Sequence, residues 1–239
     1  MSAPSGSPEP PVTTLAVIGP GRLGRVLSRA LREASFTVHG PLARADEIPH
    51  VDIAILTVPD AAIPDAAKRA RPHATQIAHV SGATDLASVD FSIHPLQTFT
   101  GAEPPAVFRG IGAAIDGRTD DDKNTARHLA DALGMIPFEV RDRATYHAAA
   151  SFASNFVLAV LDTAEQLATQ AGISNSRDIL APLVRQSVDN WQRQGAQQAL
   201  TGPIARGDDA TVAKQRTATE NTDLFDALAA ATRALKDRA

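Results

Sequence analysis

A short apolar segment near the start of the chain ends in three closely spaced glycines, in the run Leu15-Ala-Val-Ile-Gly-Pro-Gly-Arg-Leu-Gly24. A strand, Gly-x-Gly-x-x-Gly and a helix in this order predict a loop that holds the pyrophosphate of a dinucleotide at a helix N-terminus. Gly19 would make the tight turn, Gly21 would let the backbone approach the phosphates, and Gly24 would let the helix pack closely on the strand. The alternative is an ordinary glycine-rich turn, because the pattern alone also occurs by chance.

The residues after the glycines carry the helical pattern that such a motif requires. The apolar positions recur at helical spacing and define one face, formed by Leu23, Val26, Leu27, Ala30 and Leu31. Pro20 has no N–H group to offer a phosphate. We therefore expect Gly21, Arg22 and Leu23 to supply the backbone donors.

The end of the second expected strand indicates which dinucleotide binds. Phe36-Thr-Val-His39 has the pattern of a strand and runs into Gly40-Pro-Leu-Ala-Arg44. An acidic residue here would hold the ribose hydroxyls of NAD, whereas an arginine accommodates the 2′-phosphate of NADP. Arg44 precedes the acidic residues Asp46 and Glu47, so the sequence favours NADP over NAD. The alternative for Arg44 is a solvated loop charge.

Length and composition exclude several classes of protein. The chain has 239 residues, of which 44% are hydrophobic, so it can bury a core in one or two domains. Its net charge of −4 argues against a nucleic-acid-binding protein, which would carry a strongly basic face. It contains no cysteine, which excludes disulfides and thiolate metal sites, and we expect no metal centre of another kind. Neither a Gly-x-Ser-x-Gly elbow, nor a His-Glu-x-x-His helix, nor a Walker loop occurs.

Residues 1–13 are rich in proline, serine and glycine and have no apolar core. They predict a disordered tail, and neither a signal peptide nor a membrane anchor. We therefore expect a cytoplasmic protein with no membrane partner.

Short apolar runs alternate with helical stretches between residues 14 and 141. The runs cover residues 51–58, 76–80, 91–94, 112–117 and 136–140, and a helix is expected from about 120 to 133. This alternation is typical of a parallel sheet with helical crossovers. It predicts an α/β fold for residues 14–141, a Rossmann-type doubly wound sheet.

In open sheets of this kind, ligands bind at the carboxyl ends of the strands. The residues that follow the expected strands are therefore candidates for the site. The cofactor candidates are Thr57, Val58, Pro59, Ser81 and Gly82, the substrate candidates are Gln97 and Thr98, and the catalytic candidate is His94.

From residue 142 to 239 the strand-like runs stop, and the chain is rich in alanine, leucine and glutamine with helical periodicity. This pattern predicts a second, all-helical domain. Its first helix, expected over residues 144–171, is apolar on nearly every side between 148 and 161, a run too short for a membrane span. A domain of this size has difficulty covering such a helix, so we expect a homodimer.

Within that helix, His147, Ser151 and Asn155 are four residues apart and would stack on one face. An imidazole beside an amide suits proton transfer near neutral pH. The alternative is that these groups only satisfy one another inside a helix bundle. Tyr146, the only tyrosine, would point about 100° away from His147 and is the weaker candidate.

Several segments resemble one bacterial family. They are Val17-Ile-Gly-Pro-Gly-Arg-Leu-Gly24, Val58-Pro-Asp60, His94-Pro-Leu-Gln-Thr-Phe99, Tyr146-His-Ala-Ala-Ala-Ser-Phe-Ala-Ser-Asn155 and Leu200-Thr-Gly-Pro-Ile-Ala-Arg-Gly-Asp208. Together they resemble the Rossmann-like family with a C-terminal domain of unknown function 2520, within the 6-phosphogluconate dehydrogenase-like superfamily. The resemblance implies a Rossmann domain, a helical dimerisation domain of the 6-phosphogluconate dehydrogenase type, an NADP-type cofactor and a small substrate.

The chain departs from the wider superfamily at one position. Ketopantoate reductases and 3-hydroxyacid dehydrogenases place a catalytic lysine one turn before an asparagine on the first helix of the second domain. Asn155 matches the asparagine, but Ser151 stands where the lysine would be. A serine hydroxyl is too weak an acid to replace an ammonium group, so the proton donor would be His147 or His94.

These features predict an NADP-dependent oxidoreductase that acts on a small oxo or hydroxy acid, by a reduction similar to that of ketopantoate. Hydride exchange with another redox cofactor is a variant of this reading. The alternative is a nucleotide-binding sensor or partner-binding protein without turnover, which the missing lysine suggests.

Overall fold

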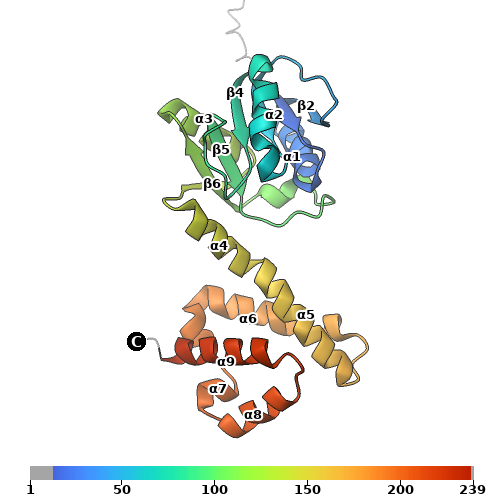
Figure 1. Ribbon diagram of the computed structural model, residues 1–239, viewed down its shortest axis with the longest axis vertical. Coiled ribbons are helices and arrows are strands. Elements are labelled where there is room, and N and C mark those ends of the chain that lie inside the picture. Colours follow the sequence, from blue (N-terminus) through green and yellow to red (C-terminus); the bar gives the residue numbers. More distant parts are fainter. Residues whose placement is uncertain (1–12, 238–239) are drawn as a thin grey trace, which may run out of the picture. The chain divides into compact units, whose positions relative to one another are not determined.

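The computed structural model describes residues 13–237. The chain divides into two compact units, with the boundary between Ser154 and Asn155 (Figure 1). The boundary expected from the sequence lay earlier, between residues 141 and 142. The expected tail, residues 1–13, falls almost wholly outside the described residues. Each unit is described by itself below.

The first unit contains a mixed sheet of seven strands in the order β2-β1-β3-β4-β5-β6-β7. The strands are β1 Thr14–Ile18, β2 Thr37–Leu42, β3 Val51–Leu56, β4 Ala74–His79, β5 Phe91–Pro95, β6 Gly112–Gly117 and β7 Ile136–Glu139. The first five run parallel to one another, as predicted. The prediction is wrong for β6 and β7, because β6 pairs antiparallel with β5 and β7 runs parallel to β6. The connection from β5 to β6 contains only the short 3-10 helix Pro105–Phe108, whereas parallel neighbours need a longer crossover.

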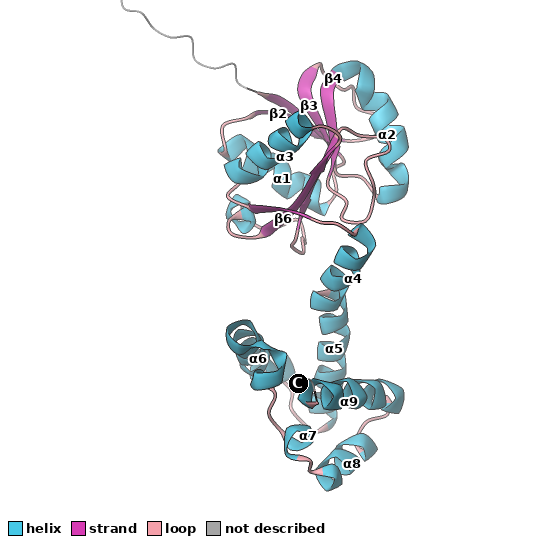
Figure 2. Cartoon of the chain, turned by 90° about the vertical axis from the view of Figure 1, so that its left-hand side faces the viewer, coloured by secondary structure: helices cyan, strands magenta, loops and turns pink. Residues whose placement is uncertain are grey.

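Helices cover both faces of this sheet, as a doubly wound fold requires (Figures 1 and 2). Helices α1 (Arg22–Glu33) and α3 (Asp120–Ala132) pack on one face, and α2 (Ile63–Ala70) packs on the other. The alternation of β1 accounts for the two cores. Leu15 and Val17 point into the core under α1 and α3, while Ala16 and Ile18 point into the core under α2. The predicted α/β fold class is therefore confirmed.

The second unit is helical. Its helices are α5 Asn155–Gln170, α6 Ser176–Ala199, α7 Pro203–Arg206, α8 Asp209–Thr217 and α9 Thr222–Lys236. The sequence predicts one helix over residues 144–171, and this is wrong. The helix α4 (Arg143–Ala153) ends at Ser154, whose φ of −130° and ψ of −75° are not helical, and α5 begins at the next residue.

Large apolar side chains of the second unit remain exposed in the single chain. Those of α5 and α6 are Phe156, Val157, Leu158, Val160, Ile179, Leu183, Val188 and Trp191. Between the two helices lies a groove of about 440 Å³, bordered by Leu158, Leu161, Leu180 and Val184. The second unit therefore leaves uncovered the apolar surface that the sequence led us to expect.

Among residues 13–237, one segment is long and apolar enough to cross a membrane by length and composition, Arg143–Gln170. The apolar stretch is thus longer than the run 148–161 that the sequence analysis above gives as too short for a span. A helix that is buried by other parts of a protein can have the same length and apolar composition, so the lack of a membrane partner stays a proposal.

Candidate functional site

The glycine loop joins β1 to α1, and two of its three glycines are required by the fold itself. Gly19 has φ of +122°, and a Cβ there would lie 2.6 Å from the carbonyl oxygen of Thr57. A Cβ on Gly24 would lie 2.0 Å from the carbonyl oxygen of Gly19. Gly21 is different, since the nearest atom to its added Cβ is 3.9 Å away. No packing inside the protein excludes a side chain at Gly21, which agrees with a position kept bare for a ligand.

The loop lies at the topological switch point of the sheet. The chain leaves β1 through α1 to reach β2 on one side, and then passes to β3 on the other side of β1. Thr57, the first residue after β3, binds the start of the loop through its side chain. Its hydroxyl lies 3.1 Å from the carbonyl oxygen of Ile18 and 2.8 Å from that of Gly19. Val58 is half-buried and Pro59 is exposed beside this turn.

The start of α1 suits a phosphate group. The helix begins at Arg22 with Gly21 at its N-cap, so the first backbone N–H groups have no partner within the helix. The first turn carries no acidic residue that would compete with a phosphate. Arg22 is exposed, whereas the Leu23 side chain turns into the core under α1. The residues present therefore fit the pyrophosphate of a dinucleotide.

The loop after β5 passes close to this helix start. An added Cβ on Gly101 would lie 3.4 Å from the Cα of Arg22. Arg29 of α1 also donates a hydrogen bond of 2.7 Å to the carbonyl oxygen of Glu103. The loop after β5 therefore packs beside the glycine loop, at the same edge of the sheet.

The substrate candidates Gln97 and Thr98 lie at the beginning of that loop. Both are exposed, and the side-chain oxygen of Gln97 accepts a hydrogen bond of 2.9 Å from the Thr98 N–H. Further along, two hydrogen bonds from Thr100 lower the pKa of Glu103 to about 2. The loop is thus held by its own polar contacts.

Arg44 lies beyond β2, which extends to Leu42 and not to His39 as predicted. The carboxylate of Asp46 accepts a hydrogen bond of 2.7 Å from the Ala43 N–H and closes a turn. Arg44 is exposed within this turn. The carboxylate of Asp46, the acidic residue nearest to Arg44 in the sequence, is therefore occupied by a backbone hydrogen bond.

The turn after β4 is organised by a buried histidine. His79 accepts a hydrogen bond of 3.2 Å at Nδ1 from the Ser81 N–H, and its Nε2 lies 3.0 Å from the carbonyl oxygen of Asp85. These partners require a neutral ring protonated at Nε2. Burial lowers the pKa of His79, which agrees with this form. The Ser81 hydroxyl bonds Thr84 and two backbone N–H groups, so the turn itself uses it.

Gly82, at the tip of this turn, lies against the ring of His94. An added Cβ would come within 2.8 Å of the ring carbon Cε1 and 3.0 Å of Nε2. The absence of a side chain at Gly82 is therefore explained by the imidazole. The sequence predicts Gly82 as a cofactor-binding residue, but its observed contact is with the candidate catalytic residue His94.

His94 and Tyr146 form a close polar pair at this end of the sheet. Nδ1 of His94, on β5, lies 2.6 Å from the hydroxyl oxygen of Tyr146, on α4. The two rings meet edge to face, and Phe138 of β7 packs on Tyr146 from another side. Burial raises the pKa of Tyr146 to about 12. Burial, with the nearby His147 and Arg143, lowers the pKa of His94 to about 4, so both groups are neutral at neutral pH.

Arg143 sets the position of α4 on the sheet. Its guanidinium donates a hydrogen bond of 2.6 Å to the hydroxyl of the buried Ser92 and forms an ion pair of 3.2 Å with Asp116. Ser92 and Asp116 are register partners on β5 and β6. Asp142 caps the helix by accepting hydrogen bonds from its first N–H groups. The first turn of α4 is therefore held to the two strands at a defined place.

The polar stripe that the sequence predicts is interrupted. His147 is exposed and Ser151 is half-buried, and both belong to α4 in the first unit. Asn155 follows the break at Ser154 and begins α5 in the second unit. Helical spacing does not put Asn155 on one face with the other two residues, because the helix is not continuous between them.

The sequence alone favours His147 over Tyr146 and does not point to Arg143 or Ser92. A usable signal was present in β5, where Ser92 and His94 must point to the same face of the sheet. On α4, Arg143 and Tyr146 are three residues apart and share a helix face. Only the docking of α4 on β5 brings the two pairs together, and the sequence gives no sign of it.

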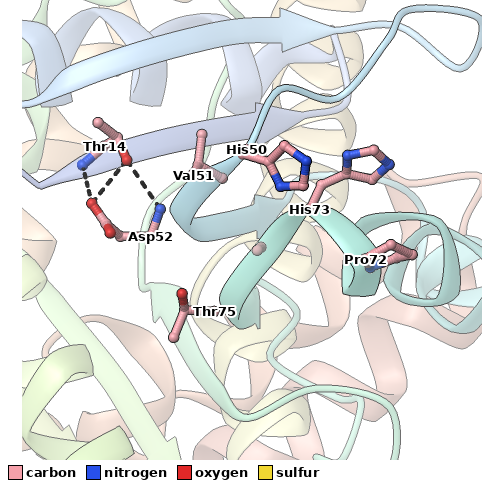
Figure 3. A pocket seen from close by; sticks show the side chains of 8 residues that line it. Thr14, His50, Val51, Asp52, Pro72, His73 and Thr75 are labelled. Atoms are coloured by element: carbon pink, nitrogen blue, oxygen red, sulfur yellow. Dashed lines mark hydrogen bonds between the residues drawn. The ribbon is translucent and has the colours of Figure 1, made fainter.

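A hollow at the opposite, amino-terminal edge of the sheet has a volume of about 420 Å³ (Figure 3). The carboxylate of Asp52 accepts two hydrogen bonds from Thr14, and the rings of His50 and His73 lie 5.2 Å apart. Within residues 13–237, no three histidine or acidic side chains are grouped as a metal site. The hollow lies away from the glycine loop and from the His94–Tyr146 pair, and we do not include it in the site.

A family model described as a domain of unknown function (DUF2520) matches residues 111–232, which is more than half of the chain. The chain belongs to the DUF2520 family. The resemblance inferred from the sequence is therefore confirmed. No curated protein sequence matches the chain.

Solved structures share the fold. A protein of Bacteroides fragilis, provisionally named an NADP oxidoreductase, is 19% identical with a TM-score of 0.80, over 93% of this chain and 98% of that one. The protein TM1727 of Thermotoga maritima is 22% identical with a TM-score of 0.78, over 94% and 100%. The pyrroline carboxylate reductase of Plasmodium falciparum, solved with NADP bound, is 12% identical with a TM-score of 0.59, over 93% and 98%.

Proposed function

We propose that this DUF2520 protein is an NAD(P)-dependent oxidoreductase. The observation that carries the proposal is the bare position at Gly21, in a glycine loop at the switch point and in front of a helix start without acidic residues. When bound, the reduced nicotinamide of such a cofactor supplies a hydride to a carbonyl or imine carbon. The names of the Bacteroides and Plasmodium proteins support the same class of reaction.

We propose NADP as the preferred form. Arg44 is exposed just beyond β2, and the carboxylate of Asp46 is engaged by the backbone of the same turn. A guanidinium at this place can pair with a 2′-phosphate, which NAD lacks. The cofactor of the Plasmodium protein supports this preference.

For the substrate, we propose a small oxo or hydroxy acid, reduced as ketopantoate reductases reduce theirs. The name of the Plasmodium protein adds a cyclic imine acid to this class. Asn155 remains a proposed site residue because it matches the asparagine of the wider superfamily. His94, His147 and Ser151 remain proposed catalytic residues on the first unit.

A second candidate function follows from Ser151, which stands in place of the superfamily's lysine. A protein that binds the nucleotide as a sensor, without turnover, needs no such acid. Equilibrium binding combined with a turnover screen distinguishes the two. Tight NADPH binding with no oxidation by any keto acid, imine or flavin acceptor would favour the sensor.

The assembly and the location of the protein are also proposals. We propose a homodimer in which a second copy covers the exposed apolar residues of α5 and α6. We propose that the protein is cytoplasmic and has no membrane partner. We also propose that it does not bind nucleic acid, since its net charge is −4.

The nucleotide site is tested by replacing Gly21 with leucine and titrating NADPH by its fluorescence. A Cβ at this position has room in the free protein and Gly21 is exposed, so we expect the thermal midpoint to stay within a few degrees of the original. It would occupy the place of the phosphates, and we expect NADPH affinity to fall by tenfold or more, or about 1.4 kcal/mol. Unchanged affinity in a folded Gly21→Leu protein would refute the assignment.

A further inference from the structure

The hydrogen bond between His94 and Tyr146 has an arrangement that the proposed function does not by itself require. Nδ1 of His94 faces the Tyr146 hydroxyl at 2.6 Å, and one hydrogen serves this contact. In one form the hydroxyl donates to Nδ1 and the ring carries its proton on Nε2. In the other form Nδ1–H donates and the hydroxyl hydrogen points away from the ring. Each form therefore leaves one outward donor, either Nε2–H or the phenolic O–H.

Both ends of the pair are accessible. His94 and Tyr146 are each only partly buried. Within residues 13–237, the one enclosed side-chain polar atom without a partner is Nδ1 of His73, on the other edge of the sheet. The Nε2 atom of His94 has no hydrogen bond to the described residues, so it reaches solvent.

We propose that Tyr146 is the general acid of the site and that His94 relays protons to it from water. Tyr146 gives its hydroxyl hydrogen to the oxygen or nitrogen that gains charge as the hydride arrives at the substrate. Nδ1 of His94 gives its hydrogen to the phenolic oxygen at the same time, and Nε2 takes one from water. For each carbonyl or imine reduced, the substrate gains one hydride from the nicotinamide and one proton, and the water that donates to Nε2 leaves as hydroxide. Exchange with solvent then frees Nε2 and restores the hydrogen to Nδ1 before the next turnover. This inference rests on the proposed oxidoreductase function.

The surroundings of the pair favour a coupled transfer over a stepwise one. The charged or titratable groups that act on His94 are Arg143 and His147 of α4, His79 of β4, and Asp60 beyond β3. Together with burial, they leave its pKa at about 4, so an imidazolium is not populated near pH 7. A tyrosinate is not populated either, because burial raises the pKa of Tyr146 to about 12. A hydrogen that passes along the pair avoids both ions.

The pair also supplies what the missing lysine would supply. A side chain that loses a proton to the substrate must be reprotonated before the next turnover, and a donor already hydrogen-bonded to the phenolic oxygen can do this without a tyrosinate being formed. The imidazole at 2.6 Å provides that route. Gly82 lies against the same ring, and no Cβ would fit between them.

The first test of the relay needs no substrate. The side-chain nitrogens of His94 are observed by NMR in protein labelled with ¹⁵N-histidine, from pH 3 to 8, with and without Tyr146→Phe. In the unmodified protein we expect a ring that stays neutral down to about pH 4 and a hydrogen-bonded signal at Nδ1. Tyr146→Phe should abolish that signal and change the ratio of the two neutral tautomers. A His94 spectrum that Tyr146→Phe leaves unchanged would overturn the proposal.

The second test follows NADPH oxidation with pyruvate, 1-pyrroline-5-carboxylate and FMN as acceptors. For the acceptor that is reduced, we expect Tyr146→Phe and His94→Gln each to lower the rate at saturation by about 100-fold, and the double variant to lose no more than either alone. NADPH affinity should be unchanged. His50→Gln, at the opposite edge of the sheet, is the matched control and should keep the full rate.

The two proposals fail in different ways. If the unmodified protein does not bind NADPH, or binds it but reduces no acceptor, the proposed oxidoreductase function is refuted, and the proton relay is refuted with it. Reduction that survives Tyr146→Phe within threefold would refute the relay alone. A purely structural role would lower the thermal midpoint of Tyr146→Phe but leave the rate of the remaining folded protein and its pH profile unchanged, which also contradicts the relay.

Discussion

The hydroxyl of Tyr146 lies 2.6 Å from Nδ1 of His94, although the two residues are 52 positions apart in the chain. A second contact runs parallel to it, from Arg143 to Ser92. Arg143 and Tyr146 are three residues apart on one face of α4, and Ser92 and His94 are two residues apart on one face of β5. Two bonds thus determine where the helix lies along the strand.

The Arg143–Ser92 contact should therefore control both stability and the charge state of His94. Replacing Arg143 with methionine leaves the buried Ser92 hydroxyl without its partner, which costs about 1–3 kcal/mol. It also removes a positive charge that lowers the pKa of His94, so this pKa should rise. Urea unfolding and NMR titration of His94 measure the two effects.

A matched variant separates the effect of the unpaired Ser92 hydroxyl on stability from the effect of the lost Arg143 charge on the pKa of His94. Adding Ser92→Ala to Arg143→Met removes the orphaned group and should recover part of the unfolding free energy, while the pKa of His94 stays raised. If Ser92→Ala recovers nothing, the contact between the two side chains does not hold α4 on the sheet.

Stability should fall as the pH drops from about 6.5 toward 4. His94 is neutral in the folded protein down to about pH 4, whereas in the unfolded chain it takes up a proton near pH 6.5. The unfolded state therefore binds more protons in this window, and the stabilisation present above pH 6.5 is lost as the pH falls. The shift corresponds to at most about 3 kcal/mol.

The contribution of His94 is isolated by comparing urea unfolding at pH 7 and pH 5 with that of His94→Gln. His79 shifts in the same direction and is present in both proteins, so it cancels in the difference. The pH dependence should be smaller in His94→Gln. An equal dependence in both proteins would show that His94 titrates normally.

Local patterns account for the parts of the fold that the sequence predicted. The glycine loop and the apolar face of α1 follow from residues that are adjacent or one helical turn apart, and both are found as predicted. The direction of β6 is different, because it depends on whether the chain between β5 and β6 builds a crossover helix. Apolar runs look the same in parallel and antiparallel strands.

The candidate site was predicted only in part, because it too depends on contacts between segments that are far apart in the sequence. His94 follows from its place at the end of a strand, but on an isolated helix the angle between Tyr146 and His147 makes Tyr146 the weaker candidate. What selects Tyr146 is the docking of α4 through Arg143, a contact across 51 residues. The break at Ser154 is likewise not visible in the helical periodicity around it.

Exchange of Arg44 for aspartate should reverse the cofactor preference. In the unmodified protein we expect tighter binding of NADPH than of NADH, because the guanidinium can pair with the 2′-phosphate. A charge-assisted contact contributes about 1.5–3 kcal/mol, so the affinity ratio should change by about tenfold or more. Fluorescence titration with both nucleotides measures this ratio.

A control with the same change in net charge is Arg118→Asp. Arg118 is exposed and follows β6, whose carboxyl end lies at the opposite edge of the sheet from the glycine loop. This variant should leave the ratio unchanged. Equal affinities for the two nucleotides in the unmodified protein would contradict the assignment of NADP.

The exposed apolar surface of the second unit should bring two copies together. Leu158 of α5 and Leu183 of α6 are 65% and 64% exposed in the single chain, and burying such side chains contributes about 1.5–3 kcal/mol each. We expect a dimer in sedimentation at micromolar concentration. Leu158→Glu or Leu183→Glu should give monomer or aggregate, because a charge would have to be buried without a partner. Gln170→Glu, an exposed polar position on α5, should leave the dimer intact. A stable monomer of the unmodified protein at that concentration would show that this surface does not serve self-association.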